Sequence, residues 1–160
     1  MSEVKKALDR LGIDLPEVVP PVASYQPAIR SGNYVYVSGQ LPMKDGSLVA
    51  TGKVGADVDT ETAYDLARTC ALNGLAAVAS IVKLEHVERV VKVTGFVASA
   101  EGYNDQPKVV NGASEILGEV FGEAGTHARS AVGVSELPLG APVEVELIVQ
   151  VKGGGEGILI

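Results

Sequence analysis

Two long stretches of the chain repeat their apolar residues at steps of three and four, the spacing of one face of an α-helix. They span residues 60–83 and 106–122. Asp59 or Thr60 would cap the start of the first stretch, and Pro107 lies in the first turn of the second, where proline is well tolerated. Both stretches are therefore predicted to be amphipathic helices that cover a core.

Other stretches alternate apolar and polar residues, which is the pattern of a half-buried β-strand. Residues 33–40 and 86–99 are rich in valine or tyrosine and predict two strands. Between the first strand and the long helix, residues 43–46 predict a turn and residues 47–50 a short returning strand.

The last two predicted strands, residues 129–135 and 142–151, are separated by the Pro/Gly turn at residues 137–140. A short turn favours a hairpin, so we expect these two strands to pair with each other. The resulting order is β-β-α-β-α-β-β. It predicts an α+β fold in which two helices pack on one face of a mixed sheet.

The N-terminal part of the chain has a different character. Residues 3–12 have a short amphipathic pattern and predict a helix that ends at Gly12. The proline-rich segment at residues 15–26 is predicted to be extended and to cross the surface before the first strand. We expect a single domain over the whole chain, with residues 1–20 as an N-terminal extension and residues 152–160 as a flexible tail.

The last strand has two different faces. Val143 and every second residue after it form an apolar row that suits the helices, whereas the opposite row is mixed and contains Glu144, Glu146, Ile148 and Gln150. The first strand also places Tyr34 and Tyr36 opposite its valines. The face away from the helices therefore carries too much apolar surface to face water. We expect a homo-oligomer closed by rotational symmetry.

Composition restricts the possible partners. The net charge of −7 and a pI near 4.8 argue against nucleic acid, because binding to phosphates needs clustered lysine and arginine. The single cysteine, Cys70, lies on an apolar helix stripe and is expected to act as a small hydrophobe. The sequence shows neither a signal peptide nor an apolar run long enough to span a bilayer, so a cytoplasmic location is expected.

The predicted hairpin would bring Arg129 close to Glu144 and Glu146. This arrangement has two interpretations: a small site for an anionic substrate, or an ordinary cross-strand ion pair.

His127 enters the same strand and could act as a general base. Neither a matching nucleophile nor a second ligand at metal-binding spacing accompanies it, and His86 is distant in the sequence. A surface or loop histidine is therefore the favoured interpretation. Gly52 and Gly55 do not form a phosphate loop, because no Gly-Lys-Ser/Thr follows them.

Three segments together resemble the Rid (reactive intermediate deaminase) family, also called the YjgF or L-PSP family. The segment YQPAIRSGNYVYVSGQLP, residues 25–42, resembles the N-terminal block of the family. Residues 93–111 resemble its T-x-F-V strand followed by a helix with an asparagine. Residues 129–146, with Arg-Ser, Leu-Pro and Val-Glu, are the most similar segment. The resemblance extends over residues 20–151.

This resemblance implies a chorismate mutase-like sandwich assembled as a homotrimer, with a central barrel of sheets and active sites between subunits. The implied activity is that of a 2-iminobutanoate/2-iminopropanoate deaminase. Such an enzyme hydrolyses reactive imines and enamines, such as 2-aminoacrylate, to 2-keto acids and ammonia. The resemblance implies neither a metal nor a cofactor.

The resemblance also assigns roles to residues. Arg129 matches the arginine that holds the substrate carboxylate, and Glu144 matches the glutamate that orients the attacking water. Further matches to the substrate pocket are Tyr25, which closes it, and Ser38, Gly39, Asn111 and Ala131.

Some of these positions have alternatives. Glu146 shares a face with Glu144 and could be the working carboxylate. Tyr25 could instead cover an edge of the core, and Asn111 could be a buried amide bonded to backbone. Ala131 replaces the cysteine of many family members, so chemistry that depends on that thiol is not expected. His127 stands where the family often has proline.

Three functions remain open from the sequence. The first is an imine or enamine deaminase, and the second is a carboxylate-binding regulatory protein with the same pocket. The third is the endoribonuclease or translation inhibitor implied by the family's older names, which the acidic composition counts against.

Overall fold

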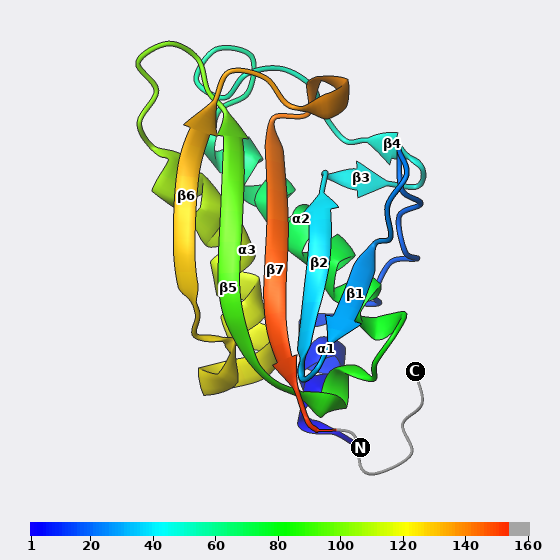
Figure 1. The fold of residues 1–160 in the computed structure, drawn as a ribbon. Helices are drawn as coiled ribbons and strands as arrows, with labels where there is room; N and C mark the ends of the chain where they lie inside the picture. Colours follow the sequence, from blue (N-terminus) through cyan, green and yellow to red (C-terminus); the bar gives the residue numbers. More distant parts are fainter. Residues whose placement is uncertain (154–160) are drawn as a thin grey trace.

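Five strands form one mixed sheet in the computed structural model, which describes residues 1–153 (Figure 1). The strands in spatial order are β1 (Ala28–Ser31), β2 (Tyr34–Gln40), β7 (Val143–Val151), β5 (Val87–Ala98) and β6 (Ala128–Val134). A separate small hairpin follows β2 and consists of β3 (Met43–Lys44) and β4 (Ser47–Leu48). Most of the predicted C-terminal tail, residues 154–160, lies outside the described residues.

Two long helices, α2 (Thr60–Ala79) and α3 (Gln106–Phe121), pack on one face of this sheet (Figure 1). The short helix α1 (Glu3–Leu11) contacts α3. This arrangement confirms the predicted α+β fold with two helices on one sheet face. Within residues 1–153, none of the helices is both long and apolar enough to cross a membrane.

The helix ends follow the local capping signals. Asp59 caps α2, because its carboxylate accepts a hydrogen bond from the backbone N–H of Thr62 at 2.7 Å. Gly12 ends α1 with a left-handed φ of 68°, as predicted. Helix α2 ends at Ala79 rather than at residue 83. The chain turns there, and Ile81 is exposed, so the apolar spacing beyond Ala79 is not part of a helix face.

The predicted hairpin between the last two strands is wrong. β5 lies between them and pairs parallel with β6 and antiparallel with β7. The chain returns from β5 to β6 through α3, and such a crossover makes the two strands parallel neighbours. β6 then occupies one edge of β5, so β7 takes the other. The turn at residues 137–140 therefore spans two strand spacings, about 10 Å.

The short strand β1 is absent from the sequence prediction. It pairs antiparallel with β2, with Ala28 opposite Val37 and Ser31 opposite Tyr34. Gly32, at a φ of 59°, supplies the left-handed conformation that this tight turn needs. The preceding prolines obscured the strand. Residues 15–26 form neither a helix nor a strand, and the chain bends at residues 22–25, so the segment is non-helical as predicted but not extended throughout.

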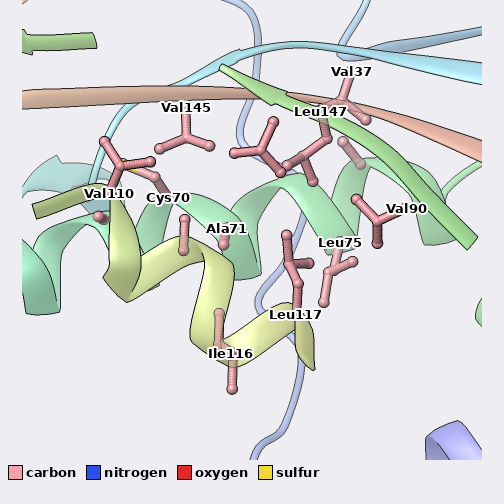
Figure 2. Packing of buried hydrophobic residues seen from close by; sticks show 14 of the residues in the cluster. Val37, Cys70, Ala71, Leu75, Val90, Val110, Ile116, Leu117, Val145 and Leu147 are labelled. Atoms are coloured by element: carbon pink, nitrogen blue, oxygen red, sulfur yellow. The ribbon is translucent and has the colours of Figure 1, made fainter. Parts of the chain in front are cut away.

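The core lies between the sheet and the two long helices. Val145 and Leu147 of β7 point toward α2, where Cys70 and Leu75 are fully buried (Figure 2). Helix α3 adds further buried apolar residues to this core, including Val110, Ile116 and Leu117 (Figure 2). Burying each large aliphatic side chain contributes about 1.5–3 kcal/mol, so this layer accounts for much of the stability of the fold.

The opposite face of the sheet is open within the described chain, and it faces the viewer in Figure 1. Ile29 and Tyr36 lie opposite each other on β1 and β2, and Tyr36 lies opposite Ile148 on β7. The exposed fraction is between 41% and 53% for Ile29, Tyr34, Tyr36 and Val132. The sheet therefore presents an extended, partly apolar surface.

Candidate functional site

The predicted site residues fall into two groups at different parts of the sheet. One group lies on β6 and α3, and comprises Arg129, Asn111 and Ala131. The other lies around the β2–β7 pair, and comprises Tyr25, Ser38, Gly39 and Glu144. Strands β5 and β7 separate β2 from β6.

Arg129 and Glu144 also lie on opposite faces of the sheet. Arg129 lies in register with Val93, a buried residue on the helix side of β5. Glu144 lies in register with Phe96, three residues further along β5 and hence on the other face. Arg129 and Glu144 therefore cannot meet within one chain. The alternative of a cross-strand ion pair between Arg129 and Glu144 or Glu146 is wrong for the same reason.

The guanidinium of Arg129 is held against helix α3. Its Nη1 donates to Asn111 Oδ1 at 2.7 Å and to Ser114 Oγ at 3.1 Å, and its Nη2 donates to the carbonyl of Pro107 at 3.4 Å. Arginine carries five N–H donors. Nε–H and the second hydrogen of Nη2 have no protein partner within residues 1–153. Nε–H shares one edge of the guanidinium plane with a hydrogen of Nη2, and a carboxylate accepts from such an edge in a bidentate pair.

Asn111 is thus one of the residues that fix Arg129. Its side chain bonds to the arginine and not to backbone, so the alternative of a buried amide paired with backbone is wrong. Ala131 lies two residues along β6 from Arg129, on the same side of the strand, and packs against the core.

Glu144 lies beside an irregularity in the β2–β7 pair. The register shifts between Val37 and Gln40, so Ser38 and Gly39 form a bulge. A Cβ on residue 39 would overlap the carboxylate of Glu144, so glycine at this position lets the carboxylate lie against the backbone. Burial raises the pKa of Glu144, and the nearby charge of Glu146 raises it further.

The bulge is held on both sides by hydrogen bonds. The backbone N–H and the hydroxyl of Ser38 donate to the carbonyls of Pro27 and Gln26, at 2.9 Å and 2.5 Å. Gln40, a buried polar residue, donates from Nε2 to the carbonyl of Ser38 at 3.0 Å. Sequence reasoning missed the role of Gln40. Its signal was a polar side chain at the end of an otherwise apolar strand row.

Tyr25 lies near this bulge in the extended N-terminal segment. It lines a shallow pocket together with Gly39, and its hydroxyl accepts a hydrogen bond from the backbone N–H of Val22 at 3.3 Å. Its side chain is 42% exposed, so it covers the bulge without being part of the core.

His127 has a partner that the sequence did not reveal. Its Nε2 lies 2.9 Å from Ser114 Oγ, and its Nδ1 lies 2.6 Å from the carbonyl oxygen of Gly125. His127 lies in the loop before β6, as predicted, although the sequence did not indicate the hydroxyl of Ser114 beside it. Ser114 follows Asn111 by three residues, so both face β6 from neighbouring helical turns. The three-residue spacing of Asn111 and Ser114 was the feature of the sequence that could have indicated this contact.

Cys70 lies apart from both groups. It is fully buried, and burial raises the pKa of its thiol well above the ordinary value. The prediction that it acts as a small hydrophobe is confirmed. Within residues 1–153, the structure shows no group of three or more His, Cys, Asp or Glu side chains that could hold a metal ion.

The chain was compared with known protein families and proteins. A sequence profile described as "YjgF/chorismate_mutase-like, putative endoribonuclease" matches residues 5–151. The chain belongs to this YjgF family. The resemblance identified from the sequence and the chorismate mutase-like α+β fold are thereby confirmed.

Individual relatives cover almost the whole chain. Protein TCP17 of Trypanosoma cruzi is 43% identical over 94% of this chain and 96% of its own length. A 2-iminobutanoate/2-iminopropanoate deaminase of Dermatophagoides farinae is 35% identical, over 88% of this chain and 95% of its own. The crystal structure of Atu1372 from Agrobacterium tumefaciens, a protein of unknown function, is 44% identical with a TM-score of 0.87, and the match covers 94% of this chain and 93% of that one.

Proposed function

We propose that this YjgF family protein hydrolyses reactive 2-imino and enamino acids to 2-keto acids and ammonia. The Nε–H of Arg129 carries the proposal, because it has no protein partner within residues 1–153 and lies on the guanidinium edge that it shares with Nη2, at a half-buried position. A 2-imino acid has a planar carboxylate that matches this edge. The Dermatophagoides farinae relative, named for this reaction, supports the choice of substrate class.

We propose further that each site is shared between two subunits. Arg129 and Glu144 lie on opposite sheet faces, so a site that uses both needs a second copy of the chain. The partly apolar sheet face offers the contact surface, with Ile29, Tyr34 and Tyr36 exposed on it. A homotrimer with rotational symmetry would repeat the same site at each subunit boundary.

In this shared site the residues divide the work. Arg129, held by Asn111, would bind the carboxylate and place the C=N carbon beside Glu144 of the neighbouring subunit. The carboxylate of Glu144 would orient a water molecule and accept its proton, while the bulge backbone at Gly39 contacts the substrate. An imine is already a strong electrophile, so positioning and proton transfer suffice, and the proposal involves no metal or cofactor.

The remaining members of the two groups would shape the pocket. Tyr25 would close it from the N-terminal segment, and Ser38 would hold the bulge in place. Ala131 lies two residues from Arg129 on β6, where its small side chain would leave more space for the substrate than a larger one. A carboxylate-binding regulatory protein would need the same arginine but not the same glutamate.

The test measures keto-acid release from 2-iminobutanoate generated enzymatically in the assay, with spontaneous hydrolysis subtracted. Arg129→Ala is expected to raise KM by about 100-fold, because two charge-assisted hydrogen bonds are lost. Glu144→Ala is expected to keep binding of 2-oxobutanoate and to lower kcat by about 100-fold. Equal rates of keto-acid release for the wild type and Arg129→Ala would contradict the proposed deaminase activity. Binding lost in Arg129→Ala without any turnover in the wild type would favour the regulatory protein.

A further inference from the structure

A chain of three hydrogen bonds runs from Nη1 of Arg129, away from the edge that Nε–H shares with Nη2. Arg129 Nη1 donates to Ser114 Oγ at 3.1 Å, Ser114 Oγ lies 2.9 Å from His127 Nε2, and His127 Nδ1 lies 2.6 Å from the carbonyl oxygen of Gly125. The three side chains come from β6, α3 and the loop before β6.

The donor and acceptor of each hydrogen bond follow from the groups at the two ends of the hydrogen-bond chain, the guanidinium of Arg129 and the carbonyl of Gly125. A carbonyl oxygen can only accept, so His127 Nδ1 carries a hydrogen and donates to Gly125. When the ring carries only this hydrogen, Nε2 is an acceptor and the hydroxyl of Ser114 donates to it. The lone pairs of Ser114 Oγ remain available for the guanidinium, which can only donate.

We propose that Ser114 and His127 are positioning residues that fix the guanidinium of Arg129 with its Nε–Nη2 edge directed to the substrate. The inference rests on the carboxylate-binding role proposed for Arg129. A serine inside a helix can turn its hydroxyl back to a carbonyl of the preceding turn. His127 holds the hydroxyl of Ser114 in the orientation that leaves its oxygen free to accept from Arg129.

The acceptor at the far end of the hydrogen-bond chain, the carbonyl of Gly125, is held in place by close packing. Gly125 is buried, and its Cα lies so close to the carbonyl of Leu117 that a side chain at this position would overlap it. The carbonyl of Gly125 is therefore a fixed acceptor, and the position of His127 follows from it. Fixing a side chain before the ligand arrives lowers the entropy cost of binding.

The geometry favours this role over a nucleophilic Ser–His pair. Ser114 lies inside α3, where the backbone N–H groups are taken up by the helix itself. They are not free to stabilise an oxyanion beside the hydroxyl. The oxygen of Ser114 also already accepts from Arg129, which ties it to the guanidinium.

The test compares Ser114→Ala and His127→Phe with variants that keep the needed groups. Ser114→Thr retains the hydroxyl, and His127→Gln retains an acceptor for it. Matched controls are Ser130→Ala, which removes a serine beside Arg129 on the other side of β6, and His86→Gln, which removes the only other histidine. Each intact protein is assayed for KM and kcat with 2-iminobutanoate, and for binding of 2-oxobutanoate by calorimetry.

Ser114→Ala and His127→Phe are expected to raise KM and the Kd for 2-oxobutanoate by about 5- to 10-fold, with kcat changed less than about 2-fold. The double variant should have the same KM and Kd as either single variant, because each substitution already breaks the hydrogen-bond chain. Ser114→Thr, His127→Gln and the two controls should remain close to wild type. Unchanged KM and Kd in the folded variants would overturn the proposal, as would a loss that His127→Gln fails to rescue.

A second readout is independent of turnover. The Nε–H signal of Arg129 in an NMR spectrum reports how freely the guanidinium rotates. It should broaden or exchange faster in Ser114→Ala and His127→Phe, and not in Ser130→Ala. If Arg129→Ala leaves hydrolysis unchanged, the proposed function fails, and the positioning inference is then decided by this signal alone. An unchanged signal would overturn it.

Discussion

The carboxyl group of Glu144 illustrates how one residue can be prepared for proton chemistry. It lies half-buried against the backbone of Gly39, with Glu146 on the same strand face. Burial and the neighbouring charge both disfavour the ionised form and raise its pKa. A carboxylate with a raised pKa is a stronger proton acceptor, which suits a group that must take a proton from water.

The raised pKa predicts a pH dependence. In the proposed mechanism the ionised form of Glu144 is the active one, so kcat should fall on acidification at a pH above the ordinary glutamate value of about 4.3. Glu144→Gln should lower kcat by about 100-fold and remove this limb of the profile. The measurement is kcat between pH 4 and 8. The matched control, Glu146→Gln, removes the second contribution and should move the limb to lower pH. A limb that persists in Glu144→Gln would assign it to another group.

At the scale of elements, helices α2 and α3 approach each other through a glycine. A Cβ on Gly112 would overlap the backbone carbonyl of Tyr64 in α2. Backbone atoms cannot move aside as the end of a flexible side chain can, so this contact sets the distance between the helices. The same contact places the α3 residues that hold Arg129, because α3 packs beside α2 and contacts β5 and β6 on the same face of the sheet.

Gly112→Ala is therefore expected to lower the free energy of unfolding by about 2 kcal/mol, because the two helices must separate. Gly118→Ala is the control on the same helix, where a Cβ would meet no atom within 4 Å. It should raise the stability by up to about 1 kcal/mol, because alanine favours the helix more than glycine does. Urea unfolding of both variants measures the difference. Equal destabilisation of both would contradict the close-contact argument.

At the scale of the whole molecule, the separation of Arg129 from Glu144 decides how a site can form. Strand β5 lies between β6 and β7, and the two side chains leave the sheet on opposite faces. In the proposed site, residues 1–153 of a single chain therefore carry two separate halves, and a second copy of the chain would complete each site. The exposed tyrosines of β2 lie on the sheet face that carries Glu144, which makes this face suitable for contact with a second copy.

Mixed oligomers test this arrangement. Arg129→Ala and Glu144→Ala should each have kcat/KM lowered by about 100-fold when alone, whereas subunits that are unfolded and refolded together as an equal mixture should regain part of the wild-type activity. In a head-to-tail ring, about a quarter of the sites would combine an intact arginine with an intact glutamate. Each variant refolded alone is the control. Failure of the mixture to regain activity, although hybrid oligomers form, would show that the two residues do not share a site.

Much of the fold was predictable because its signals are local. The spacing of apolar residues, the cap at Asp59 and the glycines after α1 and α3 depend on neighbours within a few turns of chain. Arg129, Glu144 and Asn111 were named through a family resemblance. Their assigned roles remain predictions.

The sequence by itself determined the helices, most strands and the family. Only the tertiary structure decided the strand order, because pairing depends on which strand edges are free once α3 has brought β6 beside β5. It also decided that Arg129 and Glu144 lie apart, since a side chain's face depends on its register and not on its distance along the chain. The contact of His127 with Ser114 joins a loop to a turn of α3, and the spacing of apolar residues along the sequence does not indicate such a contact.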